Sequence, residues 1–314
     1  MGKLFYSENI ACFMNNWENV DFLEIHAGRN TIAGVARDGS IYIKHLPEEM
    51  NSGGDPIPLF RRRTLAARCK DKVLHTGSGR DDLPVAAVSK LTGDIAWSVG
   101  EKIYGSGWDI PASIPGIHGM RNYRSRRIQL AASDALFALY SDGIVSFMCS
   151  RNGSAVESYH DVRNWSRVTR LVTGSQCSVF GITDGGSILC TGYNCIRGPK
   201  GDVREKLRAQ NDAVDVCSTG SECERILVAK KDGTIVDPFL DEMIFDGAFV
   251  PGYRGEKVLE SWFNYLVYVL TKERRLEHIM GKAPDPAISL WRNVTSFAIG
   301  SFDYSEPFIL AVCE

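Results

Sequence analysis

The chain has 314 residues, of which 44% are hydrophobic and 24% are charged, and its formal net charge is −2. This is the composition of an ordinary soluble globular protein, and the near-neutral charge provides no overall basic field to hold a phosphate backbone, so nucleic acid is not the expected partner. No apolar run has the length of a signal peptide or a transmembrane segment, so we expect a cytoplasmic protein without membrane contact.

One unit recurs along the whole chain. Each copy has an apolar strand that ends in a small residue or Gly, a second alternating strand, a tight turn, and a short third strand. Asp-Gly occupies several of the turns, as at Asp38-Gly39, because Gly accepts the positive φ of a tight hairpin. In chain order, the predicted strands lie at 20–28, 31–37 and 40–43; 72–77, 84–88 and 94–97; 127–132, 135–139 and 144–147; 168–174, 178–182 and 187–190; 214–220, 225–229 and 234–236; 258–262, 265–270 and 276–278; and, in an incomplete last unit, 294–300 and 308–312.

Seven units at a spacing near 45 residues predict an all-β fold, a single seven-bladed β-propeller of four-stranded antiparallel blades that spans residues 1–314. The last unit lacks its turn and third strand, and the missing piece occurs at the other end of the chain as Gly2–Tyr6. We therefore expect the N-terminal strand to complete the last blade, which closes the ring and removes an exposed sheet edge.

Trp17, Trp165 and Trp291 each precede the opening valine of a unit by three residues. A bulky aromatic side chain at a fixed place in the repeat is expected to wedge between neighbouring sheets, which is a structural role.

These features resemble the regulator of chromosome condensation repeat family. The signature is Trp-x-x-Val, a strand that ends in Ala/Thr-Gly, an apolar strand, Asp-Gly and a short strand, and it is clearest from Asn164 to Asn194. The second and sixth units fit the signature poorly, and the Gly-Gln-Leu-Gly segment of the family is absent. The resemblance implies a protein-interaction propeller, and it leaves open exchange of nucleotide on small Ran-type GTPases, inhibition of an enzyme, and scaffolding.

No catalytic constellation is evident in the sequence. Nucleotide-binding loops and nucleophile elbows are absent, the six histidines form no close pair, and the nine scattered cysteines include no Cys-x-x-Cys. His26 is expected to pack in the core. We find no paired acids or metal ligands at matching places in the units, so we predict no enzyme activity, no metal and no cofactor.

The binding surface is predicted to lie in the long segments that follow third strands, at about 47–63, 101–122, 195–208 and 237–253. These segments should emerge on one face of the propeller, where long loops on a rigid scaffold usually bind partners. Arginines and aromatics are favoured interface anchors. The candidate partner-binding residues are Phe60, Arg61, Arg62, Arg63, Trp108, Tyr123, Arg124, Tyr193, Phe249 and Tyr253.

The leading hypothesis is therefore a monomeric, non-enzymatic module that presents an insert-rich face to a protein partner, either a small GTPase or an enzyme. One alternative is a guanine-nucleotide exchange factor for a small Ran-type GTPase. Another is chromatin or nucleic-acid binding through the local arginine clusters, which would depend strongly on salt.

Overall fold

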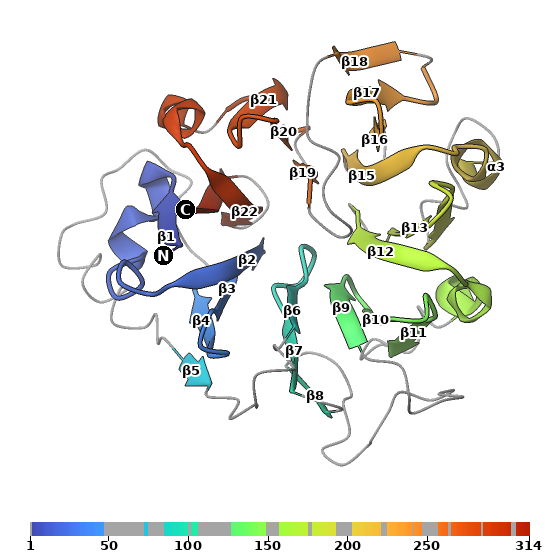
Figure 1. The fold of residues 1–314 in the computed structure, drawn as a ribbon. Coiled ribbons are helices and arrows are strands. Elements are labelled where there is room, and N and C mark those ends of the chain that lie inside the picture. Colours follow the sequence, from blue (N-terminus) through green and yellow to red (C-terminus); the bar gives the residue numbers. More distant parts are fainter. Residues whose placement is uncertain are drawn as a thin grey trace.

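Seven antiparallel sheets radiate around a common centre in the part of the chain that the computed structural model describes (Figure 1). The described residues are 2–46, 72–74, 85–99, 102–105, 127–148, 157–174, 178–192, 203–220, 225–240, 242–246, 257–262, 265–283, 285–302 and 306–314.

The sheets are numbered here in chain order. Sheet one contains β2 (Phe22–Gly28), β3 (Thr31–Ala36), β4 (Ile41–His45) and β5 (Lys72–Leu74); sheet two β6 (Val85–Val88), β7 (Ile95–Val99) and β8 (Lys102–Gly105); sheet three β9 (Arg127–Ala132), β10 (Leu136–Tyr140) and β11 (Val145–Met148); sheet four β12 (Val168–Thr173), β13 (Val179–Thr183) and β14 (Ile188–Thr191). Sheet five contains β15 (Ala213–Thr219), β16 (Arg225–Lys230), β17 (Thr234–Asp237) and β18 (Glu242–Asp246); sheet six β19 (Leu259–Ser261), β20 (Val267–Leu270) and β21 (Leu276–Met280); sheet seven β22 (Val294–Phe302), β23 (Glu306–Cys313) and β1 (Lys3–Tyr6).

The first strand of each sheet lies innermost, and each inner strand contacts the inner strand of the next sheet. The series runs β2, β6, β9, β12, β15, β19 and β22, and β22 in turn contacts β2. The backbone also joins these last two sheets, because the Asn30 nitrogen donates to the Ser301 carbonyl at 2.9 Å.

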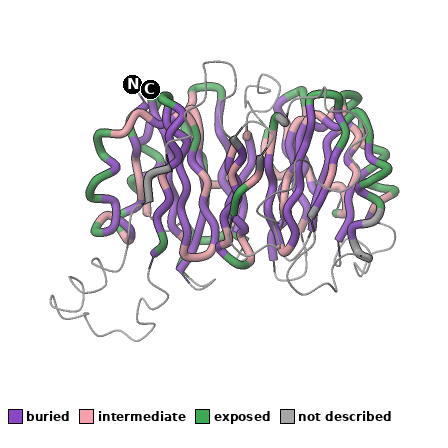
Figure 2. The backbone as a smooth tube through the Cα atoms, turned by 90° about the horizontal axis from the view of Figure 1, so that it is seen from below, coloured by how far each residue is buried: buried purple, intermediate pink, exposed green. Residues whose placement is uncertain are grey.

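The predicted pairing of the two chain ends is confirmed. β1 pairs antiparallel with β23, with Lys3 opposite Cys313 and Tyr6 opposite Leu310. The two termini therefore lie side by side, as Figures 1 and 2 show. Strands from opposite ends of the sequence share one sheet, so the outer edge of β23 is covered.

The three repeated tryptophans are structural, as predicted. Trp17, Trp165 and Trp291 are exposed by only 1%, 7% and 7%, and each belongs to an apolar cluster between neighbouring sheets. Trp165, for example, lies in the cluster that joins Phe137 of sheet three to Val179 of sheet four.

The turns between second and third strands follow the predicted chemistry. Gly39, Gly143, Gly186 and Gly233 all have positive φ, between 79° and 96°. Some of these turns also contact the next sheet, because the Gly143 carbonyl accepts a hydrogen bond of 3.0 Å from the Val168 nitrogen. The same turn in sheet six uses Arg274, a non-glycine residue at φ 54°.

The prediction for the second unit is wrong. The run at 72–77 was expected to be its first strand, but β5 instead pairs with β4 as the outer strand of sheet one, with Leu74 opposite Ile41. β6 is the inner strand of sheet two, and the turn at Gly93 links the first strand to the second. A short apolar run can form either the first strand of sheet two or the outer strand of sheet one. The open edge of β4 determines that it forms the outer strand of sheet one.

Four strands in every blade are not confirmed. Sheets one and five have four described strands, and the other five sheets have three. In three of these, a short helix packs against the third strand: η2 (Glu157–Asn164) on β11, α3 (Val203–Arg208) on β14 and η3 (Pro286–Leu290) on β21. A further 3-10 helix, η1 (Glu8–Phe13), buries Ile10 and Phe13. The expected insert at 237–253 includes β18, the fourth strand of sheet five.

The antiparallel sheets give the ring two distinct faces. The turn face carries the turns around Gly39, Gly143, Gly186, Gly233 and Arg274, and the two chain ends lie on it (Figure 2). The loop face carries the opposite ends of the same strands, where third strands terminate. Within the described residues, no helix combines the length and the apolar content that crossing a bilayer requires.

Candidate functional site

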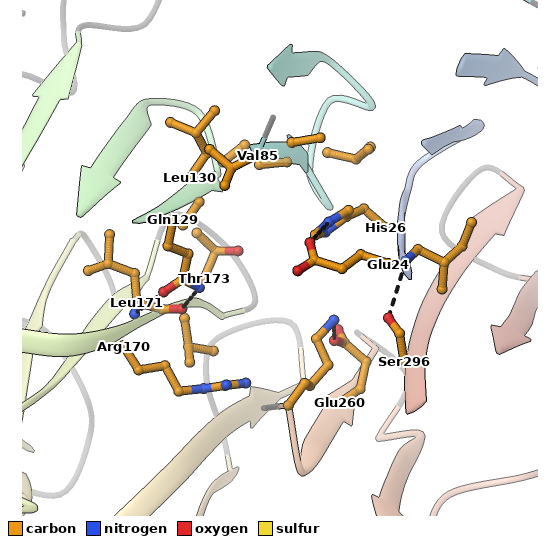
Figure 3. A pocket seen from close by; sticks show the side chains of 18 of the residues that line it. Glu24, His26, Val85, Gln129, Leu130, Arg170, Leu171, Thr173, Glu260 and Ser296 are labelled. Atoms are coloured by element: carbon orange, nitrogen blue, oxygen red, sulfur yellow. Dashed lines mark hydrogen bonds and ion pairs between the residues drawn. The ribbon is translucent and has the colours of Figure 1, made fainter. Parts of the chain in front are cut away.

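A cavity of about 740 Å³ occupies the centre of the ring. Residues from the inner strands of all seven sheets line it, and Figure 3 shows their side chains around the open middle. The lining mixes aliphatic residues, such as Leu130 and Leu171, with an unusual number of charged and polar side chains for the inside of a β fold.

The polar side chains occupy equivalent places in five inner strands. In each of these strands a register irregularity follows the first residue, and the next paired residue is polar. We call this set the polar ring, and its members are Glu24, Gln129, Arg170, Asp215 and Ser296. In sheet six, Val258 occupies the equivalent place, and Glu260 lies two residues further along the inner strand. The repeat therefore places a hydrogen-bonding group from sheets one, three, four, five and seven at one level of the channel.

Two neutral members of the polar ring join neighbouring sheets. Gln129 donates to the Leu171 carbonyl at 2.7 Å and accepts from the Leu171 nitrogen at 2.8 Å. Ser296 accepts from the Ile25 nitrogen at 3.2 Å. Both side chains form hydrogen bonds with backbone groups of the next inner strand. Strand pairing within that sheet leaves these groups without a partner.

Arg170 and Asp215 form a buried ion pair between sheets four and five. Arg170 Nε lies 2.9 Å from Asp215 Oδ1, and Nη2 lies 3.1 Å from Oδ2. The same carboxylate accepts from the backbone nitrogens of Val258 and Leu259 at 2.7 and 2.9 Å. Asp215 thus connects three consecutive sheets, and its oxygens are fully used.

Glu260 forms the centre of a second ionic cluster. Both Lys90 and Lys257 contact its carboxylate, which is only 5% exposed. Burial alone would raise the pKa of Glu260, but the two ammonium groups outweigh it and lower the pKa to about 2. Lys90 comes from the turn after β6 and also donates to the Ser261 carbonyl at 2.9 Å, so it connects sheet two to sheet six at the loop-face end of the channel.

Glu24 differs from the other members of the polar ring. Among the described residues, its only hydrogen-bond partner is His26 of the same strand, at 3.3 Å between Oε2 and Nε2. Its side chain is 56% exposed and faces the cavity, as Figure 3 shows. Burial acts to raise the pKa of Glu24, but the hydrogen bond and charge of His26 and the charge of Lys257 lower it overall.

A row of hydroxyls reinforces the ring near its loop face. Ser89 donates to the Ser133 carbonyl at 2.7 Å, and Ser261 donates to the Ser218 carbonyl at 2.8 Å. Each bond crosses from one sheet to the next. With the polar ring, these contacts tie the inner strands together through side chains.

Two expectations from the sequence are corrected by this arrangement. Acidic residues do recur at matching places, since Glu24 and Asp215 are equivalent. His26 lines the cavity beside Glu24 and is not packed in a dry core. A signal was present in the sequence: a polar residue interrupts the apolar inner strand at the same place in five units. Within the described residues, no group of His, Cys, Asp or Glu has the arrangement that a metal ion needs.

The residues predicted to bind a partner all lie outside the described residues. They are Phe60, Arg61, Arg62, Arg63, Trp108, Tyr123, Arg124, Tyr193, Phe249 and Tyr253. The ends of the strands that lead into their segments are described. His45, Gly105, Thr191 and Asp246 each end a strand shortly before one of these segments, and three of these strands are the third of their sheet, whereas β18 is the fourth.

Comparison with known proteins supports the fold and does not show a family. No protein-family model and no curated protein matches the sequence. Among solved structures, yeast RCC1 (Prp20), in a crystal structure with Kap60 bound to it, is 10% identical, with a TM-score of 0.57 over 99% of this chain and 88% of that chain. Human WBSCR16 is also 10% identical, with a TM-score of 0.54 over 94% of this chain and 88% of that chain. With its radial antiparallel sheets, this chain has the β-propeller fold.

Proposed function

We propose that the chain is a closed, seven-bladed propeller related to the regulator of chromosome condensation repeat family, and that it is a non-enzymatic module that binds a protein partner through its loop face. The observation that carries this proposal is the common direction of the third strands. β4, β8 and β14 all end at the loop face, directly before long segments that contain arginines and aromatic residues.

The side-chain hydrogen bonds between neighbouring sheets support a scaffold role. Gln129, Asp215 and Ser296 each bond to the neighbouring sheet, which fixes the sheets relative to one another. A rigid ring holds the strand ends that flank its connecting segments at constant positions, which lowers the ordering cost of binding. Yeast RCC1, which has the same fold, is known in a complex with the protein Kap60.

Affinity purification with face-specific variants tests the proposal. The loop-face variant combines Phe60→Ala, Arg62→Ala and Trp108→Ala. The matched control combines Ile144→Ala, Lys231→Ala and Lys272→Ala, which are exposed on the turn face. We expect a protein recovered with the wild type to be lost with the loop-face variant and retained with the control.

Two results would overturn the proposal. One is a partner that the loop-face variant retains, and the other is a partner that the turn-face control loses to the same extent. A fluorescent-nucleotide release assay on a panel of Ran-type GTPases separates simple binding from nucleotide exchange, since acceleration would replace the binding-module proposal by an exchange factor.

A further inference from the structure

Most charged side chains of the central channel are already committed to partners in the protein. Lys90 and Lys257 both contact Glu260, and each also donates to a backbone carbonyl, of Ser261 and Phe297 respectively. The ammonium groups of these two lysines therefore have few hydrogen-bond donors left to bind an added anion.

The charged group that remains is the carboxylate of Glu24, which faces the open space of the cavity. Glu24 bonds only to His26 among the described residues, and more than half of its side chain is exposed to the cavity. His26 lies on the same side of β2 and is 25% exposed, so an imidazole borders the carboxylate. The pKa of Glu24 is lowered by His26 and Lys257 in spite of burial, which keeps the carboxylate ionised at neutral pH. An ionised group in an enclosed site favours a partner of opposite charge.

The lining of the channel also offers apolar surface. Ile128, which follows the first residue of β9, is 44% exposed and lines the cavity. Leu23 and Leu171 line the same cavity. A ligand with a charged head and a hydrocarbon body would therefore find complementary surface for both parts.

The channel differs at its two ends. Lys90 reaches across to sheet six at the loop-face end, where it contacts Glu260 and donates to the Ser261 carbonyl. Glu24 and Ile128 lie near the beginnings of their strands, toward the turn face. Glu24 therefore lies nearer to the turn-face end of the channel. The cavity volume of about 740 Å³ lies within the range of roughly 300–1,000 Å³ that small-molecule sites occupy.

We propose that the central channel is a binding site for a small organic cation, an ammonium or guanidinium compound with an alkyl body, whose charged group contacts Glu24 and whose hydrocarbon part lies against Ile128. The site is on the opposite side of the ring from the loop face, so it does not depend on the protein partner proposed above.

Isothermal titration with matched probes tests this site. n-Butylamine, butan-1-ol and butyrate share one hydrocarbon chain and carry a positive, a neutral and a negative head group, and agmatine adds a guanidinium. We expect binding of butylamine and agmatine, with affinity at least tenfold higher than for the alcohol and the acid. Glu24→Gln should lower the affinity for both cations at least tenfold, whereas Glu205→Gln, on the exposed face of α3, should leave it unchanged.

A second measurement uses the wild-type protein only and does not rely on the stability of a variant. In a methyl NMR spectrum, agmatine should shift the resonance of Ile128 and leave that of Ile144 on the turn face in place. The proposal is overturned if millimolar cations give neither heat nor an Ile128 shift, if the alcohol binds as tightly as the amine, or if Glu24→Gln binds like the wild type. Binding of an arginine-containing peptide without binding of the small amines would also overturn it.

Discussion

Arg170 and Asp215 belong to neighbouring sheets and are joined by two hydrogen bonds, of 2.9 and 3.1 Å, in a region where both side chains are almost completely buried. Asp215 also accepts from the first backbone nitrogens of sheet six. One carboxylate therefore connects sheets four, five and six.

Asp215→Ala should be strongly destabilising, since it removes the carboxylate that pairs with the buried Arg170 guanidinium and accepts from three backbone N–H groups, those of Val216, Val258 and Leu259. We expect a loss of about 3–5 kcal/mol in the free energy of unfolding, measured by urea denaturation. Asp161→Ala is the control. It breaks the exposed pair with Arg204, 3.1 Å apart, and should cost less than about 1 kcal/mol. Similar losses in the two variants would contradict the proposed role of Asp215.

Glu260 should make the stability of the ring sensitive to acid. Its pKa is lowered from 4.5 to about 2, so its contribution is present above about pH 4.5 and is lost as the pH falls toward 2. Urea denaturation between pH 5 and pH 2 should show this loss, roughly 3 kcal/mol if the whole shift is realised. Glu260→Gln should flatten the dependence over that window, and Glu205→Gln should not. An unchanged profile in Glu260→Gln would refute the assignment.

Adjacent glycines in the turn of sheet four provide a matched pair. Gly186 has φ 79°, and a Cβ there would lie 2.7 Å from the Asp212 nitrogen. Gly186→Ala should therefore cost about 2 kcal/mol or more. A Cβ on Gly185 would have only Thr183 Oγ1 within reach, at 3.9 Å, so Gly185→Ala should change stability by no more than about 0.5 kcal/mol. Thermal unfolding of the two variants distinguishes the positions, and equal effects would argue against the turn geometry.

Leu4 tests the pairing of the chain ends. It lies opposite Val312 and is 5% exposed in the cluster that joins sheets seven and one. Leu4→Ala should cost about 2–5 kcal/mol in chemical denaturation. Lys3→Ala, at the exposed neighbouring position, should have a small effect. A small loss in the free energy of unfolding for Leu4→Ala would indicate that β1 contributes little to the stability of the sheet.

Local patterns predicted much of the fold. Alternating apolar runs and Asp-Gly turns located most strands, and the incomplete last unit indicated that β1 pairs with β23. The pairing of β5 could not be predicted, because the sequence of a short apolar run does not specify its partner strand, and β4 is distant in sequence. The short helices at the outer edges were missed for a similar reason, since a single helical turn is held by packing against a strand.

The central site was harder to predict than the strands. Glu24 and Glu260 each look like an isolated polar residue in an apolar strand when a unit is read alone. Only the alignment of inner strands around the ring brings Glu24, Lys257 and Glu260 to one cavity. Even then, the sequence does not show that two lysines contact Glu260, whereas the hydrogen-bond partner of Glu24 among the described residues is a histidine.

The pairing of β1 with β23 has a consequence for biosynthesis. β1 leaves the ribosome before the other described strands, yet its partner strand, β23, follows all of them in the sequence. Six of the sheets can pair as they emerge, whereas β1 must wait with an unsatisfied edge until translation reaches Cys313. Completion of sheet seven is thus tied to the arrival of the final strand, and a nascent chain that stalls before it would expose β1 to chaperones.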